Sequence, residues 1–179
     1  MKVLSIIIAI ILSINTYGQD DFCKHQFGIN MGEFVPLFKT QTGNFDLNYY
    51  YHLNEKHHLR SGFSYKNVID ETGEVDFNAR LGFGKTIRQL KKLHLYVASD
   101  ASWLYSKNHI DERYFYKVGL SLMMGIRYHL SKNISVSSEP GFFWYSGYSK
   151  RPNSFGSPSS TWQEHSIDNI GQLLISFHF

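Results

Sequence analysis

The feature that most constrains this chain is a regular alternation of apolar and polar residues, which recurs in eight segments. In the clearest segment, from Val118 to Leu130, an apolar or aromatic side chain occupies every second position. A period of two residues is typical of a β-strand whose two faces meet different surroundings. No stretch after residue 18 keeps a helical period, so the pattern predicts an all-β chain.

The spacing of the segments predicts a series of antiparallel hairpins. Short connections alternate with long ones, as in barrels that span a membrane with short turns at one end and longer loops at the other. Pro140 lies on the apolar face of the seventh segment and has no backbone N–H, so we expect a bulge there. The segments are 27–32, 44–53, 59–66, 75–84, 93–103, 118–130, 134–144 and 167–179. The short connections are 54–57, 88–92 and 131–133, and the longer ones are 36–42, 69–74, 106–113 and 147–164.

The N-terminus predicts a secretory signal peptide over residues 1–18. Lys2 precedes a mostly apolar run from Val3 to Ile14, and the small residues Thr16 and Gly18 suit cleavage before residue 19. The run is too short for a spanning helix, which needs about 20 residues. The alternative is a short buried helix at the start of a soluble domain. With the signal peptide removed, residues 19–179 form one predicted domain.

The direction of the apolar face separates two kinds of barrel. A soluble, lipocalin-like carrier has the same period, but its polar face meets water and is expected to be rich in lysine and glutamate. Here the polar face is rich in glycine, serine, asparagine and histidine, and only 18% of the chain is charged, against roughly 25% in soluble domains. We therefore expect the apolar face to point outward into lipid and the polar face to fill a narrow lumen.

Aromatic residues near the ends of the segments support the same orientation, because amphipathic rings favour the two lipid–water interfaces. The predicted interface aromatics are Tyr65, Trp103 and Trp144 near the loops, and Tyr128 near the turns. In hydrocarbon every backbone N–H and C=O needs a partner within the protein, so the strands must close on themselves. The prediction is an all-β, eight-stranded, antiparallel up-and-down transmembrane β-barrel with a filled polar lumen.

The chain after residue 18 resembles the outer-membrane-protein β-barrel family of Gram-negative bacteria, in its small eight-stranded form. Its alternating end is similar to that superfamily's C-terminal insertion signal, which the barrel-assembly machinery reads. The matching residues are Leu173, Ile175, Phe177 and Phe179. The resemblance implies a monomer in the cell outer membrane that contacts lipid and lipopolysaccharide and meets the assembly machinery during insertion. The family has many roles, so the resemblance leaves the task of the protein open.

The predicted lumen face carries charges that need partners, because a lone buried charge is costly. If the fourth and fifth segments pair across the connection 88–92, Arg80 lies directly opposite Asp100. Across the three-residue connection that follows the sixth segment, Arg127 and Glu139 are one same-face step apart, within reach of long side chains. We predict both as structural ion pairs that plug the barrel. The alternative is that these residues line a wet cavity. The six charges are Asp46, Arg60, Arg80, Asp100, Arg127 and Glu139.

The resemblance also raises an enzymatic alternative, since some eight-stranded barrels are lipid A acylases or deacylases. These need a histidine and a serine on one strand face, and the deacylase spacing is His-x-Ser. It occurs here only at His129 and Ser131, at a predicted periplasmic turn and so on the wrong leaflet. His165 and Ser166 lie nearer the correct end, but adjacent strand residues face opposite ways. We therefore expect no enzymatic activity.

The predicted function is a non-enzymatic structural or surface-interaction role in the outer membrane, with the segment 147–164 as the main exposed part. The alternative is a narrow channel for small solutes or ions. The formal net charge of +3 offers no argument for nucleic acid. No residue pattern points to a cofactor or to a metal site.

Overall fold

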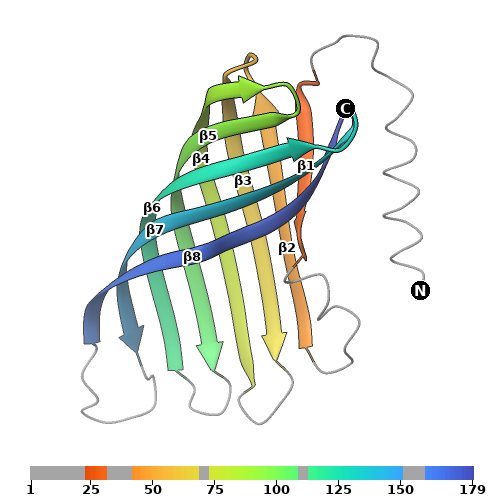
Figure 1. The fold of residues 1–179 in the computed structure, drawn as a ribbon. Helices are drawn as coiled ribbons and strands as arrows, with labels where there is room; N and C mark the ends of the chain where they lie inside the picture. Colours follow the sequence, from red (N-terminus) through yellow and green to blue (C-terminus); the bar gives the residue numbers. More distant parts are fainter. Residues whose placement is uncertain (1–22, 32–41, 69–72, 109–112, 151–159) are drawn as a thin grey trace.

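The computed structural model describes residues 23–31, 42–68, 73–108, 113–150 and 160–179, which form one closed antiparallel barrel of eight strands (Figure 1). The predicted signal peptide, residues 1–18, lies outside the described residues. The strands are β1 (His25–Asn30), β2 (Thr42–His52), β3 (His57–Val68), β4 (Glu74–Leu90), β5 (Leu93–Asn108), β6 (Arg113–His129), β7 (Ile134–Lys150) and β8 (Ser160–His178).

Closure of the barrel depends on β1, which pairs with both ends of the sheet. Gln26 of β1 lies opposite Tyr50 of β2 on one side and His178 of β8 on the other. Every strand is antiparallel to its neighbours, and neighbours along the sheet are consecutive in the chain. The predicted all-β, eight-stranded antiparallel barrel is therefore confirmed. Among the described residues, no helix is long and apolar enough to cross a bilayer.

The two ends of the barrel differ, and we name them by their connections. The connections β2–β3, β4–β5 and β6–β7 all lie at one end together with Phe179, at the top of Figure 1, and we call it the turn end. The opposite end is the loop end. There β7 and β8 continue to the pairs Ser149–Ser160 and Gly147–Trp162, so the predicted exposed segment 147–164 is wrong in part. Its two flanks, 147–150 and 160–164, belong to β7 and β8.

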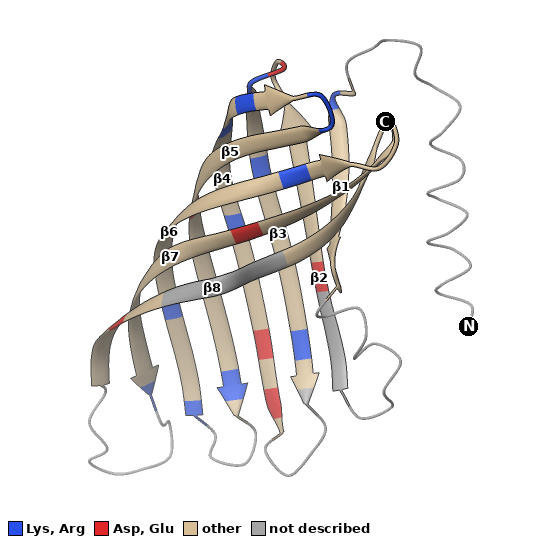
Figure 2. Ribbon diagram, viewed as in Figure 1, with Lys and Arg blue, Asp and Glu red and all other residues tan. Residues whose placement is uncertain are grey.

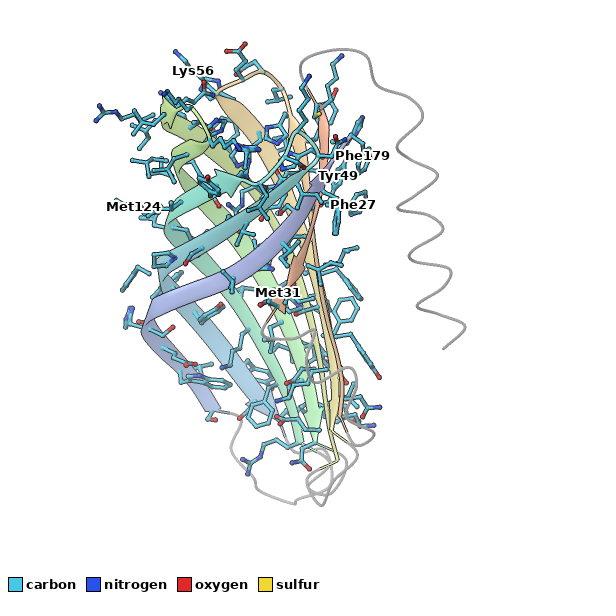
Figure 3. The ribbon with its side chains drawn as sticks, turned by 45° about the vertical axis from the view of Figure 1, so that its right-hand side comes forward. Phe27, Met31, Tyr49, Lys56, Met124 and Phe179 are labelled. Carbon is cyan, nitrogen blue, oxygen red and sulfur yellow. The ribbon has the colours of Figure 1, made fainter. Side chains whose placement is uncertain are left out.

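The apolar face of each strand points outward, as predicted. Leu81 is 70% exposed, Leu122 66% and Met124 64%, and Figure 3 shows Met124 directed away from the barrel. The predicted interface aromatics Tyr65, Trp103 and Tyr128 are also exposed on the outside, whereas Trp144 is half-buried. The buried side chains are mainly polar. They include Gln26, Asp46, Asn48, His58, Arg60, Asp100, Arg127, Ser135, Glu139, Ser176 and His178.

Register agrees with the prediction in one hairpin and differs in another. Between β6 and β7, Tyr128 lies opposite Val136 as expected, and the shift at Pro140 between β7 and β8 confirms the predicted bulge. Between β4 and β5 the turn is tighter than predicted, with Leu90 opposite Leu93. A second bulge, between residues 86 and 88, moves the register back by one residue toward the predicted pairing. The bulge leaves one residue of β4 without a partner, and an alternating pattern alone does not reveal it.

Candidate functional site: the polar interior

Large side chains lie across the interior against glycines on the neighbouring strands. A Cβ atom built on Gly125 would meet the ring of Tyr96, and one on Gly84 would meet His58. One on Gly62 would lie 2.7 Å from Nε of Arg80. The lumen of an eight-stranded barrel is just wide enough for side chains to fill, and here the glycines provide the room for the largest of them.

A buried ionic cluster crosses the middle of the barrel. Arg60 on β3 places Nη2 2.6 Å from Oε2 of Glu139 on β7, and its Nε lies 3.0 Å from Oδ1 of Asp100 on β5. Two tyrosines complete the cluster: Tyr50 donates its hydroxyl to Oε1 of Glu139 at 3.3 Å, and Tyr96 donates to the same oxygen. We call these five residues the central cluster.

The central cluster fills the middle of the lumen, because its members come from four different strands, β2, β3, β5 and β7. The side chain of Glu139 has no exposed surface, and those of Arg60 and Asp100 are each 4% exposed. The attraction between two buried charges offsets the cost of removing them from water only when their geometry is good and their remaining polar atoms are hydrogen-bonded. The two tyrosine hydroxyls serve that purpose on Glu139.

A second ion pair lies on the loop side of the central cluster. Arg80 on β4 places Nη2 3.1 Å from Oδ1 of Asp46 on β2, and it donates a hydrogen bond of 2.8 Å to Oδ1 of Asn48. Asn48 and Asn30 each donate a 3.3 Å hydrogen bond to Asp46. We call these four residues the loop-side cluster. Its chemistry is again a buried carboxylate surrounded by donors.

The two predicted ion pairs are therefore wrong, although all four residues lie in the interior. Arg80 is paired with Asp46 rather than Asp100, because the actual register places Arg80 opposite Ser102. Glu139 is held by Arg60, and Arg127 forms no ion pair with any carboxylate whose side chain the structure describes. The β6–β7 register is the expected one. The lumen is so narrow, however, that Arg60 on the opposite wall reaches Glu139, and Arg127 on the neighbouring strand does not pair with it.

Histidines line the turn end of the interior. The rings of His52 and His58 have centroids 5.3 Å apart, and His129 lies 4.6 Å from His94 and 5.1 Å from His178. Despite this gathering, no group of three or more His, Cys, Asp or Glu side chains among the described residues is arranged to hold a metal ion. We call the interior side chains at this end the turn-end layer. They are Gln26, His52, His58, His94, Arg127, His129, Ser137, Ser176 and His178.

Sequence reasoning missed the importance of Arg60 and of the turn-end histidines. Arg60 was visible as a charge on the polar face of β3, but its partners lie on β5 and β7. The histidines were visible as inward residues near strand ends. A signal was available in the sequence. These histidines lie on the polar face of their strands and close to the short turns, so they were expected at the same end of the interior.

The remaining predicted residues lie on the outside or in the turns. Phe179 stacks on His25 and Phe27 with ring centroids 5.8 and 5.7 Å apart, and Figure 3 shows it beside Phe27 and Tyr49. Phe177 lies opposite Phe27, so the proposed insertion signal forms the ladder that closes the barrel. Ser131 is exposed in the β6–β7 turn.

In comparisons with protein-family models, curated proteins and solved structures, the chain matched none.

Proposed function

We propose that this chain is an integral outer-membrane protein whose barrel is an up-and-down transmembrane β-barrel with a non-enzymatic structural or surface-interaction role. The observation that carries the proposal is the orientation of the faces: apolar side chains outside, polar and charged side chains inside. Leaving one leucine, isoleucine or methionine side chain in water forgoes about 1.5–3 kcal/mol of transfer free energy. Many such side chains cover the outer wall of β4 and β6, and a bilayer is the solvent that suits them.

The closed backbone supports the same proposal. A closed barrel has no free sheet edge, so its strands can pair their backbone N–H and C=O groups with one another. The hydrocarbon core of a bilayer requires such pairing, because it offers these groups no other partner. Strands β4 to β8 contain between 16 and 19 residues, more than the 9–11 or so that a tilted strand needs to cross a bilayer. The surplus leaves room for the loop end to extend beyond the membrane as the surface-exposed part.

The central cluster speaks against the channel alternative. Arg60, Asp100 and Glu139 are held across the middle of the lumen with almost no exposed surface. An ion passing through would have to break a buried salt bridge, which costs several kcal/mol. A structural or interaction role needs no such passage.

Basic and aromatic side chains at the loop end fit contact with lipopolysaccharide phosphates. The Nζ atom of Lys107 lies 5.4 Å from the ring centroid of Tyr114, and Lys117 forms a 2.9 Å ion pair with Glu164. Ammonium groups held at a membrane interface attract anionic head groups. At the other end, the stacked Phe179 suits recognition by the barrel-assembly machinery.

Membrane fractionation combined with heat-modifiable gel migration tests the proposal. The expected result is protein in the outer-membrane fraction that resists extraction at high salt. In detergent the unheated sample migrates differently from the boiled one, because the closed barrel stays folded until heated. Recovery in the soluble periplasmic fraction would overturn the proposal.

Planar-bilayer recording of the purified protein separates the structural role from the channel. We expect no reproducible open levels for the wild type. An R60A/E139A variant, which removes the salt bridge across the lumen, serves as the positive comparison. Reproducible open levels for the wild type that change in this variant would favour the channel instead.

A further inference from the structure

The turn-end layer contains a buried cation, Arg127, that forms no ion pair with any carboxylate whose side chain the structure describes. Arg127 is 3% exposed, and its guanidinium lies 5.0 Å from the ring centroid of Tyr96 and 5.5 Å from that of Tyr50. Its Nε and Nη2 atoms have no hydrogen-bond partner among the described residues. The carboxylates of the central and loop-side clusters form their ion pairs with Arg60 and Arg80, and Arg127 interacts with Glu139 only electrostatically, from beyond ion-pair distance.

Other buried polar atoms of the turn-end layer also lack a hydrogen-bond partner among the described residues. His58 is 1% exposed, and neither of its ring nitrogens has a hydrogen-bond partner among the described residues. Ser137 lies directly opposite Arg127 in the β6–β7 ladder, and its hydroxyl is likewise unpartnered. Three further atoms of the turn-end layer have no partner among the described residues: Nε2 of Gln26, Nε2 of His129 and Oγ of Ser176.

Arg127 and His58 face one region, because they contact the same two rings. The imidazole centroid of His58 lies 5.8 Å from the ring centroid of Tyr50 and 5.8 Å from that of Tyr96. These are the two rings over which the Arg127 guanidinium lies. Arg127 of β6 and His58 of β3 therefore lie at one region of the interior, and Ser137 of β7 is opposite Arg127 in the ladder.

The chemistry of these atoms indicates the kind of ligand they suit. Guanidinium and amide nitrogens are donors only, and hydroxyls and imidazoles can also donate. An unsatisfied buried donor costs about 1–3 kcal/mol, more when it is charged. An anion supplies acceptor capacity and opposes the charge of Arg127, whereas a cation would be repelled.

The charges of the turns around this end favour the same ligand. Figure 2 shows lysine and arginine at both ends of the barrel, and at the turn end several of them lie in the turns themselves. In and beside the described turns Glu55 is the only acidic residue. A rim of one sign of charge raises the local concentration of counter-ions. The basic residues there are Lys24, Lys56, Lys91, Lys92 and Lys132.

We propose that the turn-end layer binds one small inorganic anion of the chloride class, held by the guanidinium of Arg127 with His58 and Ser137 beside it. A free ion is favoured over a lipid head group because the donors are buried inside the barrel, away from its lipid-facing wall. The inference does not depend on the membrane location of the protein, since the atoms that carry it are interior.

Titration of the purified protein in detergent tests the site. Sodium chloride replaces sodium gluconate at constant ionic strength, since gluconate is too large for the interior, and the arginine Nε–H resonances are followed by NMR. We expect one resonance, assigned with the R127K variant, to shift with a saturable dependence on chloride. In urea, chloride is expected to raise the unfolding midpoint along the same saturation curve.

Two variants and a control make the result specific. In R127M we expect chloride affinity to fall by about tenfold or more, because a charge-assisted hydrogen bond is lost. R88Q removes the same charge from the exposed turn end of β4 and is expected to bind chloride like the wild type. If R127M does not fold, S137A is measured instead, with a several-fold weaker site expected.

The proposal is overturned if the wild type shows no chloride-dependent shift. It is also overturned if chloride raises the urea unfolding midpoint linearly and equally in the wild type, R88Q and R127M, since that result indicates general charge screening. Saturation by inorganic phosphate at far lower concentration than by chloride would replace the chloride class with an oxyanion.

Discussion

Arg60 on β3 and Glu139 on β7 form an ion pair of 2.6 Å between residues 79 positions apart in the chain. The two strands stand on opposite walls of the eight-stranded barrel, with three strands between them on either side. The pair therefore links the walls directly through the lumen. Backbone pairing holds each strand only to its neighbours, so this contact couples parts of the sheet that no ladder joins.

Breaking the Arg60–Glu139 pair from one side is expected to destabilise the barrel strongly. R60M leaves two carboxylates buried without their cation, which should lower the free energy of unfolding by about 3–5 kcal/mol. Urea unfolding in lipid vesicles measures the change. K117Q is the matched control, because the Lys117–Glu164 pair is exposed and worth about 0–1 kcal/mol. Equal effects of the two substitutions would contradict the role given to the central cluster.

Adding one methyl group to Gly125 is expected to displace Tyr96. A Cβ there would lie 2.6 Å from Cε1 of the Tyr96 ring, so the ring and its hydrogen bond to Glu139 must move. Overpacking of this kind costs about 1–3 kcal/mol. G28A is the control, since the nearest atom to its Cβ is the hydroxyl of Ser176 at 3.0 Å. If both alanine variants unfold at the same urea concentration, the interior is looser than described.

Arginine substitutions on β6 are expected to reveal the depth of the bilayer. Leu122 lies in the middle of the strand and Leu130 just beyond its turn end, and both are exposed on the outside. L122R should cost about 2–4 kcal/mol and L130R about 0–1 kcal/mol if lipid surrounds the barrel. The measurement is reversible unfolding from lipid vesicles. Small and equal costs for both would mean that the apolar wall does not lie in hydrocarbon.

Truncating Phe179 is expected to impair assembly more than it impairs stability. In F179A the stacking with His25 and Phe27 is lost, together with the aromatic end of the proposed insertion signal. The fraction of heat-modifiable protein in cells should fall, while protein refolded in detergent stays closed. F83A removes an exposed phenylalanine from β4 and is expected to assemble normally. Equal assembly of the two variants would remove the signal from Phe179.

The β-hairpins differ in how far their register could be predicted. The β6–β7 register followed from a short turn and an unbroken alternation, and Tyr128 lies opposite Val136 as expected. The β4–β5 register could not be predicted in this way, because Leu90 pairs with Leu93 and a bulge follows near residue 87. At the turn Lys91 takes a positive φ of 49°, a conformation that residues other than glycine adopt rarely and that the sequence did not signal.

The sequence by itself determined the period, the number of strands and the face on which each side chain lies, because alternation is a local property of an extended chain. It also predicted which charges are inside. Only the tertiary structure decided which of them meet. Arg60 pairs with Glu139 and Arg80 pairs with Asp46. The guanidinium of Arg127 lies over the rings of Tyr50 and Tyr96. The reason is physical: closing the sheet into a narrow barrel brings opposite walls within side-chain reach, and small shifts of register choose among the partners.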